Sequence, residues 1–219
     1  MPHAKLPRKS TNIDMTAMCD VAFLLLTFFM LATKFKPDEP VVVITPSSIS
    51  QITLPDVDIM LITVDNKGRI FFSVDNKLKR KLLIDDVNSV KNLGLSEDEK
   101  NAFALGSSIG FPFNQLKSFL AASGDQQKAM VAAAPGIPAD TSAFAPNNEL
   151  AVWVNSARET NNKIRICIKA DGEASYPFVQ KIIKTFEGEK IFKFNLITNL
   201  KAIPQGTAAY ADAHATEKK

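Results

Sequence analysis

The longest run of apolar residues lies near the N-terminus, where residues 15–33 read MTAMCDVAFLLLTFFMLAT with a single charged side chain, Asp20. A helix rises about 1.5 Å per residue, so this run would span about 28 Å, the thickness of a hydrocarbon core. Its apolar side chains fall on every side of a helix instead of along one stripe, a pattern typical of a helix in lipid. The pattern therefore predicts a transmembrane helix at residues 13–33.

Two other interpretations of this segment have to be weighed. A buried helix of a soluble domain needs either an amphipathic face or a very large core, and this 219-residue chain offers neither. A cleaved signal peptide fits the basic residues Lys5, Arg8 and Lys9, but Leu31-Ala32-Thr33 is not a small-x-small cleavage site, and Asp20 interrupts the apolar core. A retained anchor is the interpretation that the residues favour.

The charges that flank the segment predict its orientation. Three basic residues precede it in residues 1–12, whereas residues 34–39 carry two lysines accompanied by two acids. Because Lys and Arg are enriched in cytoplasmic flanks, and because the long polar part of the chain follows the helix, we expect a single-pass protein of the cell inner membrane. Its N-terminus would be cytoplasmic and its C-terminal domain periplasmic.

After residue 57 the pattern changes to short alternating strands and helices. Ile59–Val64 and Arg69–Val74 read as two strands joined at Asp65–Gly68, where Gly68 supplies a positive φ. A strand at Lys163–Ala170, a helix at Tyr176–Phe186 and a strand at Ile191–Ile197 follow near the C-terminal end. The pattern predicts an α+β fold: the transmembrane helix, then a domain with a mixed β-sheet and helices packed on one face.

Between the two strand regions the chain reads as helical. Ser96–Glu99 is a capping box that opens a helix to about Leu105, Phe113–Ala122 and Asn148–Glu159 have helical spacing, and Ala132–Asn147 has loop composition. The expected organisation is a cytoplasmic tail at 1–12, the membrane helix at 13–33, a periplasmic linker at 34–57, a periplasmic domain at 58–204 with a helical insertion at about 85–160, and a disordered tail at 205–219.

Composition excludes several classes of function. The net charge is +3, and the one basic run, Lys77–Lys81, reads as a solvated strand end or loop, so a nucleic-acid surface is not expected. The two cysteines, Cys19 and Cys167, fall in different parts of the predicted topology and cannot bridge. Both histidines lie in the tails, and no G-x-S-x-G or H-E-x-x-H motif occurs, so we expect no metal, no cofactor and no enzymatic activity.

Asp20 is the candidate functional residue, because an ionised carboxylate in hydrocarbon costs about 2.5–3.5 kcal/mol on insertion scales. Two outcomes remain open: Asp20 is protonated in lipid, or it faces the polar interior of a complex. One helix has no interior of its own, so the residue implies partner helices. Thr16 and Thr27 fall on the same helical face and would form a supporting polar stripe.

The residues around Asp20 resemble the ExbD/TolR family of proton-channel subunits. The family pattern is Ile-Asn-Val-Thr-Pro, two residues, Asp-Val, and then an aliphatic and phenylalanine run. This chain matches at Ile13, Thr16, Asp20 and Val21, continues with Leu24–Met30, and departs with Asp14, Met15 and Ala17 in place of Asn, Val and Pro. The resemblance covers roughly residues 12–80 and 160–200, and it implies that Asp20 carries a proton.

The resemblance implies a proton-motive-force-coupled subunit of an ExbB–ExbD-like inner-membrane motor that energises periplasmic or outer-membrane transport. Implied partners are a ring of ExbB/TolQ-like multi-span subunits, a second copy of the chain, and a TonB-like or Tol–Pal-type periplasmic client. The alternative is a single-span envelope anchor, or a peptidoglycan- or protein-binding module, in which Asp20 only joins helices without proton coupling. A membrane-anchored periplasmic enzyme is disfavoured by the missing catalytic set.

Overall fold

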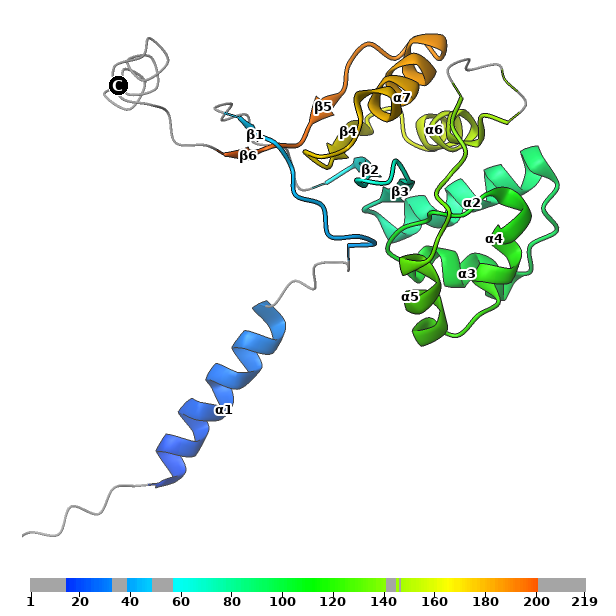
Figure 1. Ribbon diagram of the computed structural model, residues 1–219. Coiled ribbons are helices and arrows are strands. Elements are labelled where there is room, and N and C mark those ends of the chain that lie inside the picture. Colours follow the sequence, from blue (N-terminus) through cyan, green and yellow to red (C-terminus); the bar gives the residue numbers. More distant parts are fainter. Residues whose placement is uncertain (1–14, 33–38, 49–56, 141–144, 146, 201–219) are drawn as a thin grey trace, which may run out of the picture. The chain divides into compact units, whose positions relative to one another are not determined.

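The computed structural model describes residues 15–32, 39–48, 57–140, 145 and 147–200 (Figure 1). The chain divides into two compact units, Met1–Pro37 and Asp38–Lys219. The described part of the first unit is helix α1, Met15–Ala32, in which no residue is buried. The second unit is an α+β domain.

A four-stranded mixed sheet in the order β3-β2-β4-β5 forms the centre of the domain. Strands β2 (Ile59–Val64) and β3 (Ile70–Val74) are antiparallel. Strand β4 (Arg165–Ala170) runs parallel to β2, and the two-residue β5 (Asn195–Leu196) runs parallel to β4. The predicted mixed sheet is confirmed, and its order joins the two strand regions through the β2–β4 pair.

The β2–β3 turn has the geometry that the sequence predicts. Gly68 has φ +78°, and a Cβ at this position would lie 2.5 Å from the ring of Phe178. The carboxylate of Asp65 accepts from the backbone N–H of Lys67 at 3.0 Å and of Arg69 at 2.8 Å. Its second oxygen lies 2.7 Å from Nε of Arg69. These bonds fix the turn, because Asp65 is buried and its oxygens are satisfied locally.

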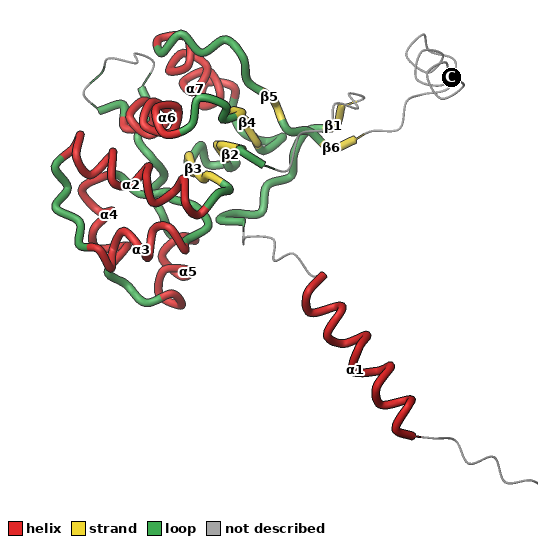
Figure 2. Tube along the Cα trace, turned by 180° about the vertical axis from the view of Figure 1, so that it is seen from behind, coloured by secondary structure: helices red, strands yellow, loops and turns green. Residues whose placement is uncertain are grey.

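Helices α2 (Lys77–Lys91), α6 (Glu149–Thr160) and α7 (Tyr176–Gly188) lie on the same side of the sheet (Figures 1 and 2). They bury the sheet face that carries Met60, Ile62 and Val64, three side chains that alternate along β2. Helical packing on one face, as predicted, is confirmed.

Three further helices, α3 (Glu97–Leu105), α4 (Phe113–Leu120) and α5 (Gly124–Ala132), lie between α2 and α6 in the chain. Trp153 of α6, fully buried, connects α3 and α4 to the sheet. Its ring centroid lies 5.5 Å from Phe72 of β3, 5.6 Å from Phe103 of α3 and 5.4 Å from Phe113 of α4. The helical insertion therefore shares one continuous core with the sheet.

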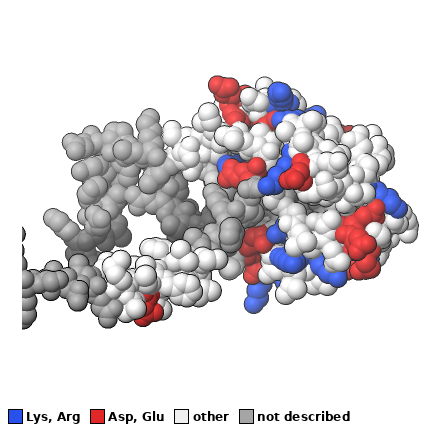
Figure 3. Space-filling model, turned by 90° about the horizontal axis from the view of Figure 1, so that it is seen from below, with Lys and Arg blue, Asp and Glu red and all other residues white. Residues whose placement is uncertain are grey.

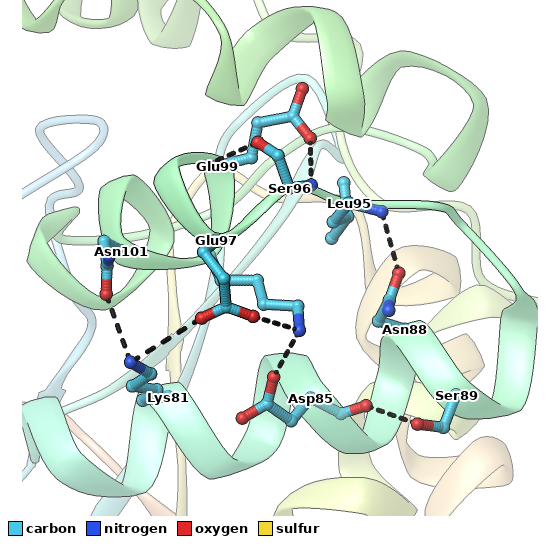
Figure 4. Close-up of polar contacts among 10 residues, drawn as sticks. Lys81, Asp85, Asn88, Ser89, Leu95, Ser96, Glu97, Glu99 and Asn101 are labelled. Atoms are coloured by element: carbon cyan, nitrogen blue, oxygen red, sulfur yellow. Dashed lines mark hydrogen bonds and ion pairs between the residues drawn. The ribbon is translucent and has the colours of Figure 1, made fainter.

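A polar network joins α2 to α3 (Figure 4). Nζ of Lys100 lies 2.9 Å from Asp85 and 2.8 Å from Glu97, and hydrogen bonds to Glu97 and then to Asp85 raise the pKa of Lys100. The capping box predicted at the start of α3 is present: Ser96 N–H donates to Glu99 at 2.8 Å, and Glu99 N–H donates to Ser96 Oγ at 3.3 Å.

Three elements differ from the expectations. The interpretation of Lys77–Lys81 as a strand end or loop is wrong: these residues begin α2, because Asn76 caps the helix and Leu83 and its neighbours Ile84 and Val87 are buried. Helix α5 was not expected. The strand expected at Ile191–Ile197 shrinks to β5, because Ile191 N–H donates to Phe186 O at 2.8 Å and ties this segment to α7.

The described part of the segment assigned to a linker, residues 39–48, packs on the domain. Glu39 and Lys169 form an ion pair at 2.6 Å, and Val43 and Thr45 are buried. Strand β1 (Ser47–Ser48) pairs in parallel with β6 (Asn199–Leu200), a contact across most of the domain sequence. The tails expected at 1–12 and 205–219 lie outside the described residues.

Candidate functional site

Helix α1 has the length and polarity of a membrane span. Its 18 residues have a mean hydropathy of 2.0. Apolar side chains project from all sides, and Phe23 and Leu31 are 64% and 88% exposed. In Figure 3 its surface is uncharged apart from one acidic spot. Water is a poor solvent for such a surface, so lipid or the apolar helices of other subunits have to cover it.

Asp20 is the one ionisable acid of α1, and it lies five residues into the helix. It therefore sits about 7 Å along the axis from the start of the helix, too deep for its short side chain to reach past the first turn. Among the described residues, none makes a hydrogen bond or ion pair with its carboxylate. The carboxylate is thus presented outward on the helix, where a group from another subunit or a proton can neutralise its charge.

Thr16 and Thr27 lie on the same face of α1 as Asp20. At 100° per residue, Thr16 is offset from Asp20 by about 40° and Thr27 by about 20°, at heights of about 6 Å below and about 10 Å above. Thr27 Oγ1 donates to Leu24 O at 2.9 Å, so its proton is used within the helix, and its oxygen is left as an acceptor. The helix thus brings the three predicted residues onto one polar stripe without direct contact.

Cysteine and metal chemistry gain no support from the described residues. No group of three or more His, Cys, Asp or Glu side chains is placed there to hold a metal ion. Cys19 and Cys167 are both free thiols. Burial raises the pKa of the Cys167 thiol, opposed in part by its hydrogen bond with Asn195, and a thiol kept protonated is a weak nucleophile.

The domain carries a cleft that the sequence patterns do not predict. It has a volume of about 1160 Å³ and lies between the end of α6, the start of β4 and residues 190–195. Its basic side chains, Arg158, Arg165, Lys190 and Lys193, come from two separate stretches of the chain. The sequence signal was the local density of Arg, Lys and Asn in these stretches, which becomes a surface only when β5 pairs with β4.

Comparison with known proteins agrees with this geometry. The family model described as biopolymer transport protein ExbD/TolR matches residues 7–201, a span that includes α1 and the whole described domain. A search of curated proteins and a search of solved structures each found no significant match. The chain therefore belongs to the ExbD/TolR family, whose members are membrane-bound, non-enzymatic subunits of biopolymer transport complexes.

Proposed function

We propose that this protein is the proton-motive-force-coupled subunit of an ExbB–ExbD-like inner-membrane motor, and that Asp20 carries the proton. One observation supports the proposal above all. This member of the ExbD/TolR family has one carboxylate in helix α1, that of Asp20, and the other sides of the helix are apolar. Such a group is costly to keep and marks ion pathways in membrane proteins.

The energy available to the carboxylate is large enough to move a helix. A proton that crosses about 150 mV releases roughly 3.5 kcal/mol. Protonated Asp20 is neutral and tolerates apolar surroundings, whereas ionised Asp20 requires a polar or basic group opposite it. Each protonation therefore makes apolar surroundings more favourable for the Asp20 face of α1, and each loss of the proton makes polar surroundings more favourable. This alternation would drive the helix from one position in its complex to another.

The proposed partners follow from the exposure of α1. A single helix cannot shield its own carboxylate, so we place it, with a second copy, inside a ring of ExbB/TolQ-like multi-span subunits. The membrane segment is assigned to residues 13–33, with the N-terminus cytoplasmic and the domain periplasmic. Residues 39–48 belong to that domain by their packing, so the connecting segment is shorter than the expected 34–57. In the periplasm the domain would engage a TonB-like or Tol–Pal-type client and energise periplasmic or outer-membrane transport.

The test replaces Asp20 by Asn, which keeps size and polarity but cannot ionise. We expect Asp20→Asn to insert and to co-purify with the ring subunits at wild-type levels, because removal of a buried charge does not hinder insertion. Energy-dependent transport should fall to the level of a deletion strain. Asp20→Glu, which titrates but extends the carboxylate by one methylene, should keep part of the activity.

Asp14→Asn is the matched control, because it removes an acid that precedes helix α1 in the sequence and leaves Asp20 in place. It should leave transport close to wild type. An assembled and fully active Asp20→Asn complex would refute proton carriage, and the anchor or envelope-binding module without proton coupling would then be the remaining function. If Asp20→Asn fails to assemble with the ring subunits, the role of Asp20 would instead be to hold helices together.

A further inference from the structure

The cleft of the domain has an apolar floor. Ile166 of β4 and Ile191 are buried beneath it, Ile164 and Phe194 are half-buried beside them, and the ring of Phe192 is 76% exposed at its edge. All five come from residues 164–166, around the start of β4, and from residues 191–194, which lead into β5. An extended chain that lies in this cleft would therefore bury apolar side chains against a preformed surface.

The rim of the cleft is basic. Arg158, Arg165, Lys190 and Lys193 line it together with one carboxylate, Glu159. The whole chain has 26 basic and 23 acidic residues, so 22 of each remain when the four cations and one acid of the cleft are set aside. The formal excess of positive charge in this protein is thus equal to the charge of the cleft.

The cations are available to a ligand. Among the described residues, no carboxylate lies within ion-pair distance of these four side chains. Arg158 is held in place, since its Nη1 donates to Glu189 O at 3.3 Å. Lys190 follows α7 with φ +56° and donates its N–H to Glu187 O at 3.1 Å. A positioned guanidinium loses less freedom when it binds a carboxylate, which it matches with two parallel hydrogen bonds.

The cleft also suits a peptide backbone. Three amide side chains, Asn155, Asn162 and Asn195, line it and offer both donors and acceptors. Strand β5 pairs with β4 at Cys167 and Ile168, so Arg165 and Ile166 border the cleft without a strand neighbour on that side. A phosphate ion would leave most of about 1160 Å³ unfilled, and nucleic acid needs a basic surface that extends beyond one cleft.

From these observations we propose that the cleft binds an extended acidic segment of a partner protein, in which Asp or Glu alternates with apolar residues. The carboxylates meet Arg158, Arg165 and Lys193, and the apolar side chains lie on the floor beside Phe192. The proposal does not depend on proton carriage by Asp20, because every group involved belongs to the domain.

The test uses the full chain in detergent micelles and a fluorescent ten-residue peptide of alternating Glu and Leu. A peptide with Lys in place of Glu is the probe control. The double variant Arg165→Glu with Lys193→Glu should weaken binding of the acidic peptide about tenfold or more. The matched variant Lys67→Glu with Lys77→Glu makes the same change in net charge at exposed positions outside the cleft, and should bind within about twofold of wild type.

Fluorescence of Trp153, which lies outside the cleft, reports whether each variant is folded. Equal weakening by both double variants would overturn the proposal, because the peptide would then respond to net charge alone. Unchanged binding by the cleft variant would overturn it as well. A third result would also overturn the proposal: the acidic peptide does not bind, and phosphatidylglycerol vesicles or single-stranded DNA bind in a way that requires the cleft cations.

Discussion

At Asp20 the free energy of hydrating a carboxylate opposes the apolar character of the residues around it. This conflict is local, so the apolar helix Met15–Ala32 could be predicted from the sequence of this segment alone, and the role of Asp20 stays a prediction. The core could not be predicted in the same way. Trp153 has no distinctive sequence context, and its three aromatic neighbours come from β3, α3 and α4. Only the fold brings them together.

Trp153 is expected to be the residue on which the cohesion of the inserted helices most depends. Replacement by Ala leaves a cavity at the junction of sheet and helices, and should lower the free energy of unfolding of the domain by about 3–5 kcal/mol. Trp153→Phe should cost less, because a ring still fills part of the site. Urea unfolding followed by circular dichroism measures both, with the exposed Val90→Ala as the control. Wild-type stability of Trp153→Ala would contradict the single shared core.

At the scale of elements, the helices and turns that could be predicted are those with a signal in a few adjacent residues, and the ones that could not be predicted have no such signal. The capping box at Ser96 and the glycine turn at Gly68 are local signals, and both are confirmed. Helix α2 was missed because its first turns are rich in lysine and its buried residues lie later, at Leu83 and beyond. Helix α4 begins after Pro112 without a side-chain cap of its own, and a distant residue, Glu149, supplies one.

Glu149 should stabilise the domain through its contact with α4. Its Oε2 accepts from Phe113 N–H at 2.7 Å. Glu149→Ala removes this acceptor and should lower the free energy of unfolding by about 1 kcal/mol. Glu149→Gln keeps an oxygen acceptor and should be tolerated. Thermal or urea unfolding of the three proteins side by side measures the difference, and equal stability of the Ala variant and wild type would exclude the capping role.

The same pair gives a pH dependence. Burial raises the pKa of Glu149 above its ordinary value of 4.5, although the hydrogen bond from Phe113 and the charge of Lys91 oppose the shift. The folded protein therefore holds this proton more tightly than the unfolded chain. The contribution of this proton to the free energy of unfolding is fully present below about pH 4.5, and it is lost as the pH rises through the pKa of Glu149 in the folded protein. Glu149→Gln should become more stable relative to wild type over that window; a constant difference would contradict the shift.

For the molecule as a whole, the fold class could be predicted from alternating and helical patterns, but the architecture could not. The order β3-β2-β4-β5 depends on β2 meeting β4, which lies about a hundred residues later in the chain. Two further long-range contacts, Glu39 with Lys169 and β1 with β6, fasten residues 39–48 to the domain. Sequence patterns do not encode such pairings locally. The basic cleft likewise depends on a pairing between distant segments, that of β4 with β5.

The contacts of residues 39–48 with the rest of the domain determine where a soluble fragment has to begin. A fragment that starts at Asp38 should give a mixed α/β circular dichroism spectrum and should melt cooperatively. A fragment that starts at Val57 lacks buried Val43, the Glu39–Lys169 pair and β1, and should be less stable by about 2–3 kcal/mol. A disordered spectrum for the longer fragment would contradict the division into units, and equal stability of both would contradict a structural role for residues 39–48.

The central claim, that Asp20 carries the proton, is tested most directly by proton flux. The protein is reconstituted with its ring subunits in vesicles that hold a pH-sensitive dye, and a potential of about 150 mV is imposed. Wild type and Asp14→Asn should acidify the vesicles at the same rate. The rate of acidification with Asp20→Asn should not exceed the rate in protein-free vesicles. Proton flux through Asp20→Asn at the wild-type rate would contradict the account.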